Sequence, residues 1–548
     1  MKISGHQSQS APRKEFEIAD DFLKKFNDLN PLSASEEGFT NYDSHIGDLS
    51  PIAKDDTASL AKETIKKLKQ EVPTDKHAQL CSDVLSDYCE DLIDEYKTLD
   101  YLRGTSFVDN PLDQIHISAL NIDFSSKIAR ENLGSKVSRI PEALESYKET
   151  LLYAKHKKAL PRKRQILRIM GSCNIYSAEP LFQNSVAPGA FSDFKEFLQN
   201  EILDSTIEND AVGIEQYKRS AKRHLGKDID VYETYLWGFE EVRTILREAD
   251  TVAAKITPGE GYLAAVNYLD SDPEYNLNSV PELRSFLKLL IQEALEDLDG
   301  KHFDIDPRLK NIEAATIEES GTYAMFYVPN SDDFTRSART YYPINGKTKF
   351  STWAEATTCF HESIPGHHLH LGSIKCMGDN LSHFQKTLAC NTGMAEGWAL
   401  YAERLMVELN LMRDPGYVLG MYAASLFRAL RVVIDIGLQC GYQIPNDAPQ
   451  IFERGSYFNR DMAIDLLVKY ARETPEYCND EVDRYLGWVG QAISYKVGEK
   501  TIREIRENER ERLQGWFSLK DFHSRVLSYG HVGLGRLETL FSDDLTDE

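Results

Sequence analysis

The stretch TTCFHESIPGHHLHLGS, residues 357–373, begins like the metal-binding helix of a zinc hydrolase. His361 and Glu362 are adjacent, as in the H-E-x-x-H motif, where a second histidine follows one helical turn later and both imidazoles bind one metal. Here that second position holds Pro365, and the next histidines are His367, His368 and His370. The stretch is therefore either a broken motif or another way of building the same site.

Pro365 and Gly366 decide between these two interpretations. Proline has no N–H, so it removes the helical hydrogen bond to the carbonyl of His361, and glycine adds backbone freedom directly afterwards. In an unbroken helix, His361 and His367 would be separated by about 9 Å of axial rise, which is too far for both to bind one zinc ion. A bulge or kink that absorbs two residues would bring His367 to the missing ligand position.

The remaining histidines of the stretch rank lower as ligands. His368 would require three absorbed residues, so it is the second choice, and otherwise it should face the substrate. His370 is expected at the surface or behind the ligands. If His367 binds the metal, its second ring nitrogen should be held by a carboxylate or a carbonyl, as is usual for ligating histidines.

A third ligand is expected from the segment CNTGMAEGWALYAERLMVEL, residues 390–409. Its two acids, Glu396 and Glu403, are seven residues apart and lie on one face of a helix. Glu396 adjoins a glycine in a small-residue stretch that allows close helix approach, so we predict that Glu396 binds the metal. Glu403 is followed by an arginine and is expected to be a paired structural acid. Glu362 would then be the general base, and Zn²⁺ the expected metal.

Helical periodicity dominates the chain, which predicts a mainly α fold with few short strands. The strongest strand candidate is GTYAMFYVP, residues 321–329. Residues 1–300 are predicted to form a helical scaffold and residues 301–548 the zinc-binding catalytic region, with one core shared between them. The clearest helical segments are residues 59–72, 142–160, 283–298 and 499–513.

Composition restricts the possible partners and the compartment. The 548 residues include 63 basic and 87 acidic side chains, a net charge of −24, which argues against binding to nucleic acid or to anionic membrane surfaces. The eight cysteines contain no C-x-x-C pair and are expected to be reduced. The N-terminus lacks the apolar core of a signal peptide, so we predict a soluble cytoplasmic protein whose oligomeric state the sequence leaves open.

Three motifs together resemble the family catalogued as domain of unknown function 885. They are HESIPGHHLH, the downstream EGWALYAERL and the later GQAISYKVGEKTIREIRE, and residues 515–535 resemble the C-terminal pattern of that family. The resemblance implies a large helical metallohydrolase of the gluzincin type with a central cleft or channel. It also implies zinc at His361, at the histidine pair after Pro-Gly and at Glu396, with Glu362 as the base.

The chain departs from the usual pattern of this family at two positions. Gln439, in VVIDIGLQC, replaces a histidine, and Val489 replaces the proline of W-P-G-Q-A. Neither change affects the predicted metal ligands, so hydrolysis stays plausible, whereas both put the substrate preference in question.

Further residues are candidates for contacts with the substrate. Tyr495 is the candidate donor to the oxyanion that develops at the attacked carbonyl, although it could equally be a core tyrosine. Lys496, Arg428 and Arg431 are candidates for binding a substrate carboxylate, for which a guanidinium offers bidentate pairing. The two arginines could instead pair with Asp435 and neighbouring acids.

These features predict a zinc-dependent hydrolase that cleaves an amide bond. A carboxypeptidase-like metallopeptidase acting on short peptides is the leading version. The alternatives are a zinc amidase for a non-peptide acyl amide or specialised metabolite, and a catalytically degenerate binding scaffold. The intact His361, Glu362 and Glu396 argue against the scaffold, because a scaffold has no need of a base.

Overall fold

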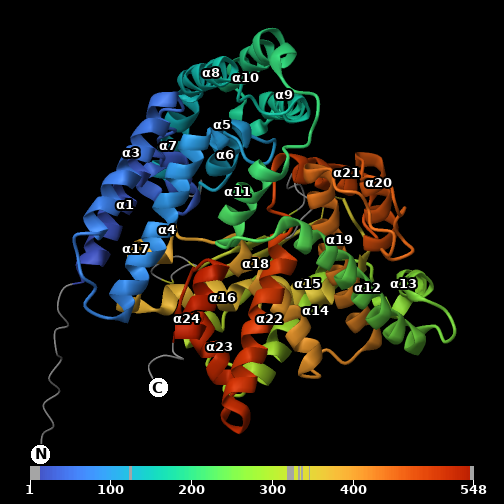
Figure 1. The fold of residues 1–548 in the computed structure, drawn as a ribbon. Helices are drawn as coiled ribbons and strands as arrows, with labels where there is room; N and C mark the ends of the chain where they lie inside the picture. The colour runs from blue at the N-terminus through green and yellow to red at the C-terminus, as the bar shows by residue number, and fades with distance from the viewer. Residues whose placement is uncertain are drawn as a thin grey trace, which may run out of the picture.

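The computed structural model describes residues 13–122, 126–317, 326–330, 334, 337–344 and 346–543. It is mainly α-helical with a few short strands, which confirms the predicted fold class. The N-terminal helices, blue to teal in Figure 1, gather into one body. They are α1 (Lys14–Leu29), α2 (Pro31–Glu36), α3 (Pro51–Leu68), α4 (Lys76–Thr98), α5 (Asp100–Arg103), α6 (Pro111–Leu120), α7 (Lys127–Ser138), α8 (Ile140–Lys157), α9 (Lys163–Ala178) and α10 (Ala187–Phe197).

Local sequence signals explain where many of these helices begin. Asn110 accepts hydrogen bonds from the backbone of Leu112 and Asp113, and Pro111 occupies the first turn of α6. Ser50 caps α3 in the same manner, again with a proline directly after it. Polar caps followed by proline therefore set the entry points of the amphipathic helices.

The rest of the chain supplies the other helices and all the strands. The helices are α11 (Ile214–Leu225), α12 (Val231–Ile256), α13 (Tyr262–Ser271), α14 (Val280–Leu298), α15 (Thr352–Glu362), α16 (His367–Cys376), α17 (His383–Lys386), α18 (Thr392–Glu408), α19 (Pro415–Cys440), α20 (Arg460–Leu466), α21 (Pro475–Gly487), α22 (Ser494–Leu513), α23 (Leu519–Ser528) and α24 (Leu534–Asp543). The strands are β1 (Asn276–Leu277), β2 (Ile312–Ile317), β3 (Phe326–Val328), β4 (Ala338–Pro343) and β5 (Phe350–Ser351).

The strands form two small sheets. β4 lies between β2, to which it is parallel, and β3, to which it is antiparallel, while β1 pairs with β5. The strand predicted at 321–329 is confirmed at Phe326–Val328, and residues 321–325 lie outside the described part of the chain.

Three apolar clusters form the core. One lies within residues 32–203 and joins α6, α8, α9 and α10. The second packs α12 against α19 and α21, and the third joins α1, α4 and α14 to α15, α18 and α22. Apolar packing therefore crosses residue 300, and the region boundary expected there stays a prediction.

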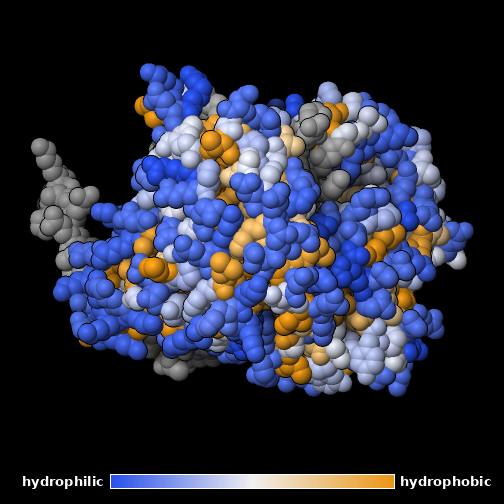
Figure 2. Space-filling model, turned by 90° about the horizontal axis from the view of Figure 1, so that it is seen from above, coloured by the Kyte–Doolittle hydropathy of each residue, from blue (hydrophilic) through white to orange (hydrophobic). Residues whose placement is uncertain are grey.

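Helix α19 is the most apolar long helix among the described residues. It is long and apolar enough to cross a membrane, but 72% of its most apolar window is buried inside the protein, as in the core helix of a folded domain. The face in Figure 2 is mostly hydrophilic, with hydrophobic residues gathered near its centre. In this fold α19 thus serves as a central packing element, beside α12 and α15.

Candidate metal centre

The helix is broken where Pro365 and Gly366 interrupt it. Helix α15 ends at Glu362 and α16 begins at His367, and the link contains a cis Ile364–Pro365 peptide bond. The N–H of Gly366 donates to the carbonyl of Phe360 at 3.0 Å. A Cβ at position 366 would lie 1.9 Å from the carbonyl oxygen of His361, so only glycine fits this tight return. The predicted departure from α-helix between Ile364 and His367 is confirmed.

This break brings His361 and His367 together. Their ring centroids are 4.8 Å apart and the rings are nearly perpendicular. The Nε2 atoms of His361 and His367 lie 3.4 Å and 3.5 Å from the same oxygen, Oε2 of Glu396. Two imidazole nitrogens and one carboxylate oxygen thus converge on a single point, in the arrangement expected from the sequence.

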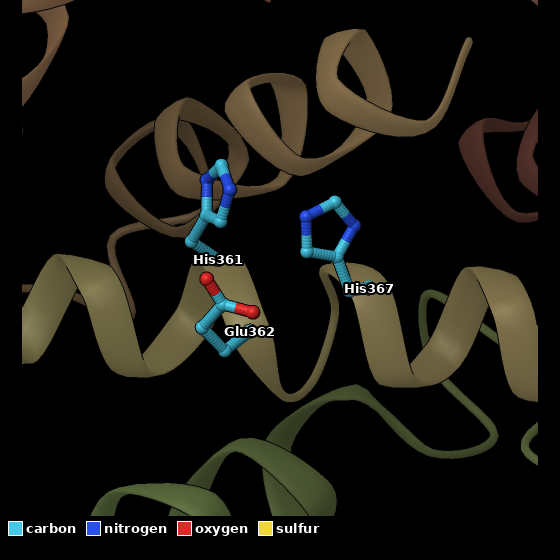
Figure 3. A group of neighbouring side chains, drawn as sticks. All are labelled: His361, Glu362 and His367. Carbon is cyan, nitrogen blue, oxygen red and sulfur yellow. The ribbon is translucent and has the colours of Figure 1, made fainter. Parts of the chain in front are cut away.

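Glu362 lies beside the two histidines. Figure 3 shows its carboxylate below the two rings, next to the break between α15 and α16. Ligand atoms of His361, Glu362 and His367 all lie within 4.8 Å of one another, so this His-Glu-His group could itself hold a metal ion. Oε2 of Glu396 lies almost equally far from both Nε2 atoms, so Glu396 could join the two histidines around a cation, with Glu362 beside them.

Glu403 supports His361 from behind, a role that the sequence analysis missed. Its Oε1 lies 2.8 Å from Nδ1 of His361, and its Oε2 accepts a hydrogen bond from Thr357. A carboxylate at Nδ1 places the proton there and leaves Nε2 free for a metal. Glu403 is thus a paired acid, as expected, but its partners are His361 and Thr357, whereas Arg404 pairs with Glu248 and Glu499. The spacing of seven residues could have revealed this role, because it places Glu403 on the same helix face as Glu396.

The electrostatics of the centre are those of a cation site. Burial favours the neutral ring, but the carboxylates of Glu396 and Glu403 outweigh burial and raise the pKa of His361 to about 9. Burial would also raise the pKa of Glu396, whereas the two histidines beside its Oε2 hold it well below its usual range. The two carboxylates therefore favour positive charge at His361, as a cation site requires.

Buried atoms without partners show that the donor set fits a metal ion. Oε2 of Glu362, Oε2 of Glu396 and Nδ1 of His367 are buried without a hydrogen bond from any described residue. Such atoms are costly, and a cation would satisfy the carboxylate oxygens. The support expected at the second nitrogen of His367 is thus wrong within the described structure, and it is found on His361 instead.

The other histidines of the stretch point elsewhere. His368 is buried between the hydroxyl of Tyr327, 3.0 Å from its Nδ1, and the carbonyl of Leu309, 2.7 Å from its Nε2. It therefore anchors α16, and the structure gives no support for the expected substrate contact. His370 is also fully buried, against Trp398 and His531, so the expectation of a surface position is wrong.

Close helix contact brings Tyr495 towards the centre. A Cβ at Gly397 would lie 2.4 Å from the backbone of Gly498, so α18 and α22 touch at their glycines, as the small residues beside Glu396 predicted. Tyr495 begins α22, is half-buried, and has its pKa raised by burial and by the charge of Glu396. It therefore stays a neutral O–H donor near the ligand set.

The three predicted carboxylate-binding residues differ in their surroundings. Lys496 is 1% exposed and forms ion pairs with Glu241 and Glu499, so its charge is already neutralised and its predicted substrate role has no support. Arg431 pairs with Glu481, whereas Arg428 forms no ion pair with any described residue. The alternative pairing with Asp435 is not observed, since that carboxylate accepts from Tyr217.

The two departures from the family pattern are buried structural positions. Gln439 accepts from the backbone of Val212 and donates to the carbonyl of Tyr485. The carbonyl of Val489 accepts from the hydroxyl of Ser220. Gln439 holds the segment before α11, and Val489 holds α11 itself, close to the end of α21. Both positions therefore act on packing and not at the metal centre.

Comparison with known proteins gives the fold and the family. A putative lipoprotein from Colwellia psychrerythraea has a similar structure, with a TM-score of 0.82 and 16% identity over 98% of this chain and 99% of that one. A putative lipoprotein of unknown function from Shewanella oneidensis follows, with a TM-score of 0.73 and 16% identity over 98% and 100%. No curated protein matches. The family described as Bacterial protein of unknown function (DUF885) matches residues 31–540, and this chain belongs to it.

Proposed function

We propose that this chain is a zinc-dependent hydrolase that cleaves an amide bond, with short peptides as the leading substrate class. The observation that carries the proposal is the convergence of His361 Nε2 and His367 Nε2 on one oxygen of Glu396. A free oxygen of Glu362 lies beside them. Two imidazoles, one carboxylate and an adjacent free carboxylate are the components of a catalytic zinc site with its general base.

In this proposal each residue has a defined task. His361, His367 and Glu396 hold the cation, which supplies Lewis acidity towards the carbonyl and lowers the pKa of water. Glu362 takes a proton from the attacking water as the water oxygen bonds to the carbonyl carbon. Glu362 then delivers that proton to the amine nitrogen as the C–N bond breaks, leaving a carboxylic acid and an amine. Tyr495 donates a hydrogen bond to the developing oxyanion.

The alternatives are ranked by the same geometry. A zinc amidase for a non-peptide acyl amide would use the same centre, with only the pocket walls different. A degenerate scaffold is disfavoured, because the buried free oxygen of Glu362 costs stability and a mere binding protein gains nothing from it. The central channel implied by the family resemblance stays a prediction, since two hollows of about 680 and 580 Å³ are lined by other residues.

The substrate class and the cellular compartment are inferred from net charge and from similar proteins, not from the geometry of the site. The net charge of −24 supports a small substrate over nucleic acid or an anionic membrane. The description of two similar structures as putative lipoproteins points away from the cytosol, so the cytoplasmic location stays a prediction. Fractionation of the producing cells, followed by detection of the protein in each fraction, tests it.

The test of the proposal is a pair of variants at adjacent positions. Glu362→Gln keeps the size and hydrogen bonding of the side chain but cannot accept a proton. It should retain about one zinc per chain and lose at least ~10²-fold in kcat on a peptide library read by mass spectrometry. His361→Ala should lose the metal itself, measured by elemental analysis. Equal metal content in wild type and His361→Ala would refute the ligand assignment, and near-normal turnover in Glu362→Gln would refute the base.

A further inference from the structure

Arg428, a guanidinium without a carboxylate partner among the described residues, lies on α19. This helix packs against α15, which carries His361 and Glu362. Arg428 and Arg431 are one turn apart on α19, which packs closely on α15. Arg428 acts on the metal centre electrostatically: burial raises the pKa of Glu403, and the charge of Arg428 is among the causes that lower it. This region of positive charge occurs in a chain with 24 more acidic than basic side chains.

Arg431 is fully engaged by its surroundings. Its Nη2 donates to Glu481 at 3.0 Å and its Nε to the hydroxyl of Tyr485 at 3.1 Å. Its guanidinium carbon lies 4.2 Å from the ring centre of Phe427 and 4.7 Å from that of Tyr495. Arg431 therefore fixes the ring of Tyr495 by stacking and has little freedom to bind a substrate.

Arg428 lacks a carboxylate partner among the described residues, although its guanidinium carbon lies 5.8 Å from the ring centre of Phe427. Its Nη1 donates to the carbonyl of Ala424 in its own helix, at 3.2 Å, and its Nε is buried without an acceptor among the described residues. Of the acids whose pKa it affects, Glu403 is occupied by His361 and Thr357. Glu473 is influenced more by Lys347 than by Arg428. A half-buried guanidinium without a direct carboxylate is costly unless a ligand completes it.

From this we infer that Arg428 binds a carboxylate of the substrate, and that the hydrolase releases the residue carrying it. The inference rests on the proposed function. It narrows the substrate to peptides with a free C-terminus and N-acyl amino acids, in which the carboxylate lies one residue beyond the scissile amide. The guanidinium offers two parallel N–H donors, which match a carboxylate better than an ammonium group does.

The experiment compares matched substrates in matched variants. An N-acyl dipeptide is assayed as the free acid and as the C-terminal amide, with wild type, Arg428→Gln, Arg428→Lys and Arg413→Gln. Arg413 is exposed on the loop before α19 and controls for loss of one charge. Wild type and Arg413→Gln should favour the free acid, Arg428→Gln should lose about 10- to 100-fold on the acid alone, and Arg428→Lys should recover part of the loss. Metal content and thermal melting verify that each variant is folded.

A binding measurement separates this inference from the proposed function. In the Glu362→Gln background, which lacks the proposed base, isothermal titration of N-acetylphenylalanine should show binding at least about 10-fold weaker when Arg428→Gln is added. Hydrolysis that is equal for acid and amide in wild type would overturn the inference and leave the hydrolase intact. Binding that depends on Arg428 without any hydrolysis would support the anion site and overturn the hydrolase, and absence of both would overturn both.

Discussion

The apolar cluster of the N-terminal helices and the core around the metal centre are both well packed, but the second gathers several ionisable side chains in one place. The cluster within residues 32–203 buries aromatic and aliphatic side chains, including Phe182 and Phe191, both at 0% exposure. The metal-centre core buries His361, Glu362 and Glu403 at 3%, 6% and 3% exposure. Burial of ionisable groups costs free energy that apolar burial provides. The N-terminal cluster thus contributes to the free energy of folding. Burying the ionisable groups of the metal centre lowers that free energy, but it holds the site in a fixed geometry.

The largest effect that would sharpen this contrast is a cavity in the N-terminal cluster. Phe191 packs against the rings of Phe182 and Tyr176. Phe191→Ala should lower the free energy of unfolding by about 3–5 kcal/mol, because it removes a buried ring and leaves a void. Chemical denaturation measures the loss, and elemental analysis should find the metal content of the folded protein unchanged. Loss of metal in parallel would show that the two regions are not separable.

The sequence predicted those features of the site that follow from local chemistry. Pro365 and Gly366 could only break a helix, and counting residues across the break selected His367 over His368. The glycine beside Glu396 predicted the tight contact between α18 and α22 that the structure shows.

What the sequence could not predict depends on contacts between distant segments. Glu403 was expected to be a paired structural acid, but its partner could not be predicted: its Oε1 lies 2.8 Å from Nδ1 of His361 on another helix. Lys496 looked available for a substrate until Glu241, far away in sequence, proved to pair with it. For His370 the sequence left open a surface position or one behind the ligands, because nothing in its own helix shows that α23 and the segment around His531 cover it.

A smaller effect is expected at the carboxylate behind the metal ligands. Glu403→Gln keeps a hydrogen bond to His361 Nδ1 but removes the charge that stabilises the ligand, so metal affinity should fall about 10- to 100-fold. Competition with a chelator of known affinity measures it. Glu408→Gln, an exposed position on the same helix, makes the same charge change and should leave the affinity unaltered. Equal affinities in the two variants would reduce Glu403 to a packing residue.

The smallest effect concerns acid stability, which should fail first on the metal-centre side of the molecule. Burial lowers the pKa of His531 to about 4, and burial also lowers the pKa of His523 to about 3. In the unfolded chain His531 has an ordinary histidine pKa near 6.5, so between about pH 6.5 and 4 it binds a proton that it does not bind in the native state. The contribution of His531 is therefore constant above about pH 7, falls as the pH drops through 6.5, and levels off below about 4. At pH 5.5 the loss should be about 1 kcal/mol.

Denaturation at several pH values measures this effect. The free energy of unfolding should depend less steeply on pH in His531→Gln than in wild type, whereas His156→Gln, an exposed position on α8, should match wild type. If the slopes of all three proteins coincide, His531 is protonated in the native state and the acid sensitivity originates elsewhere.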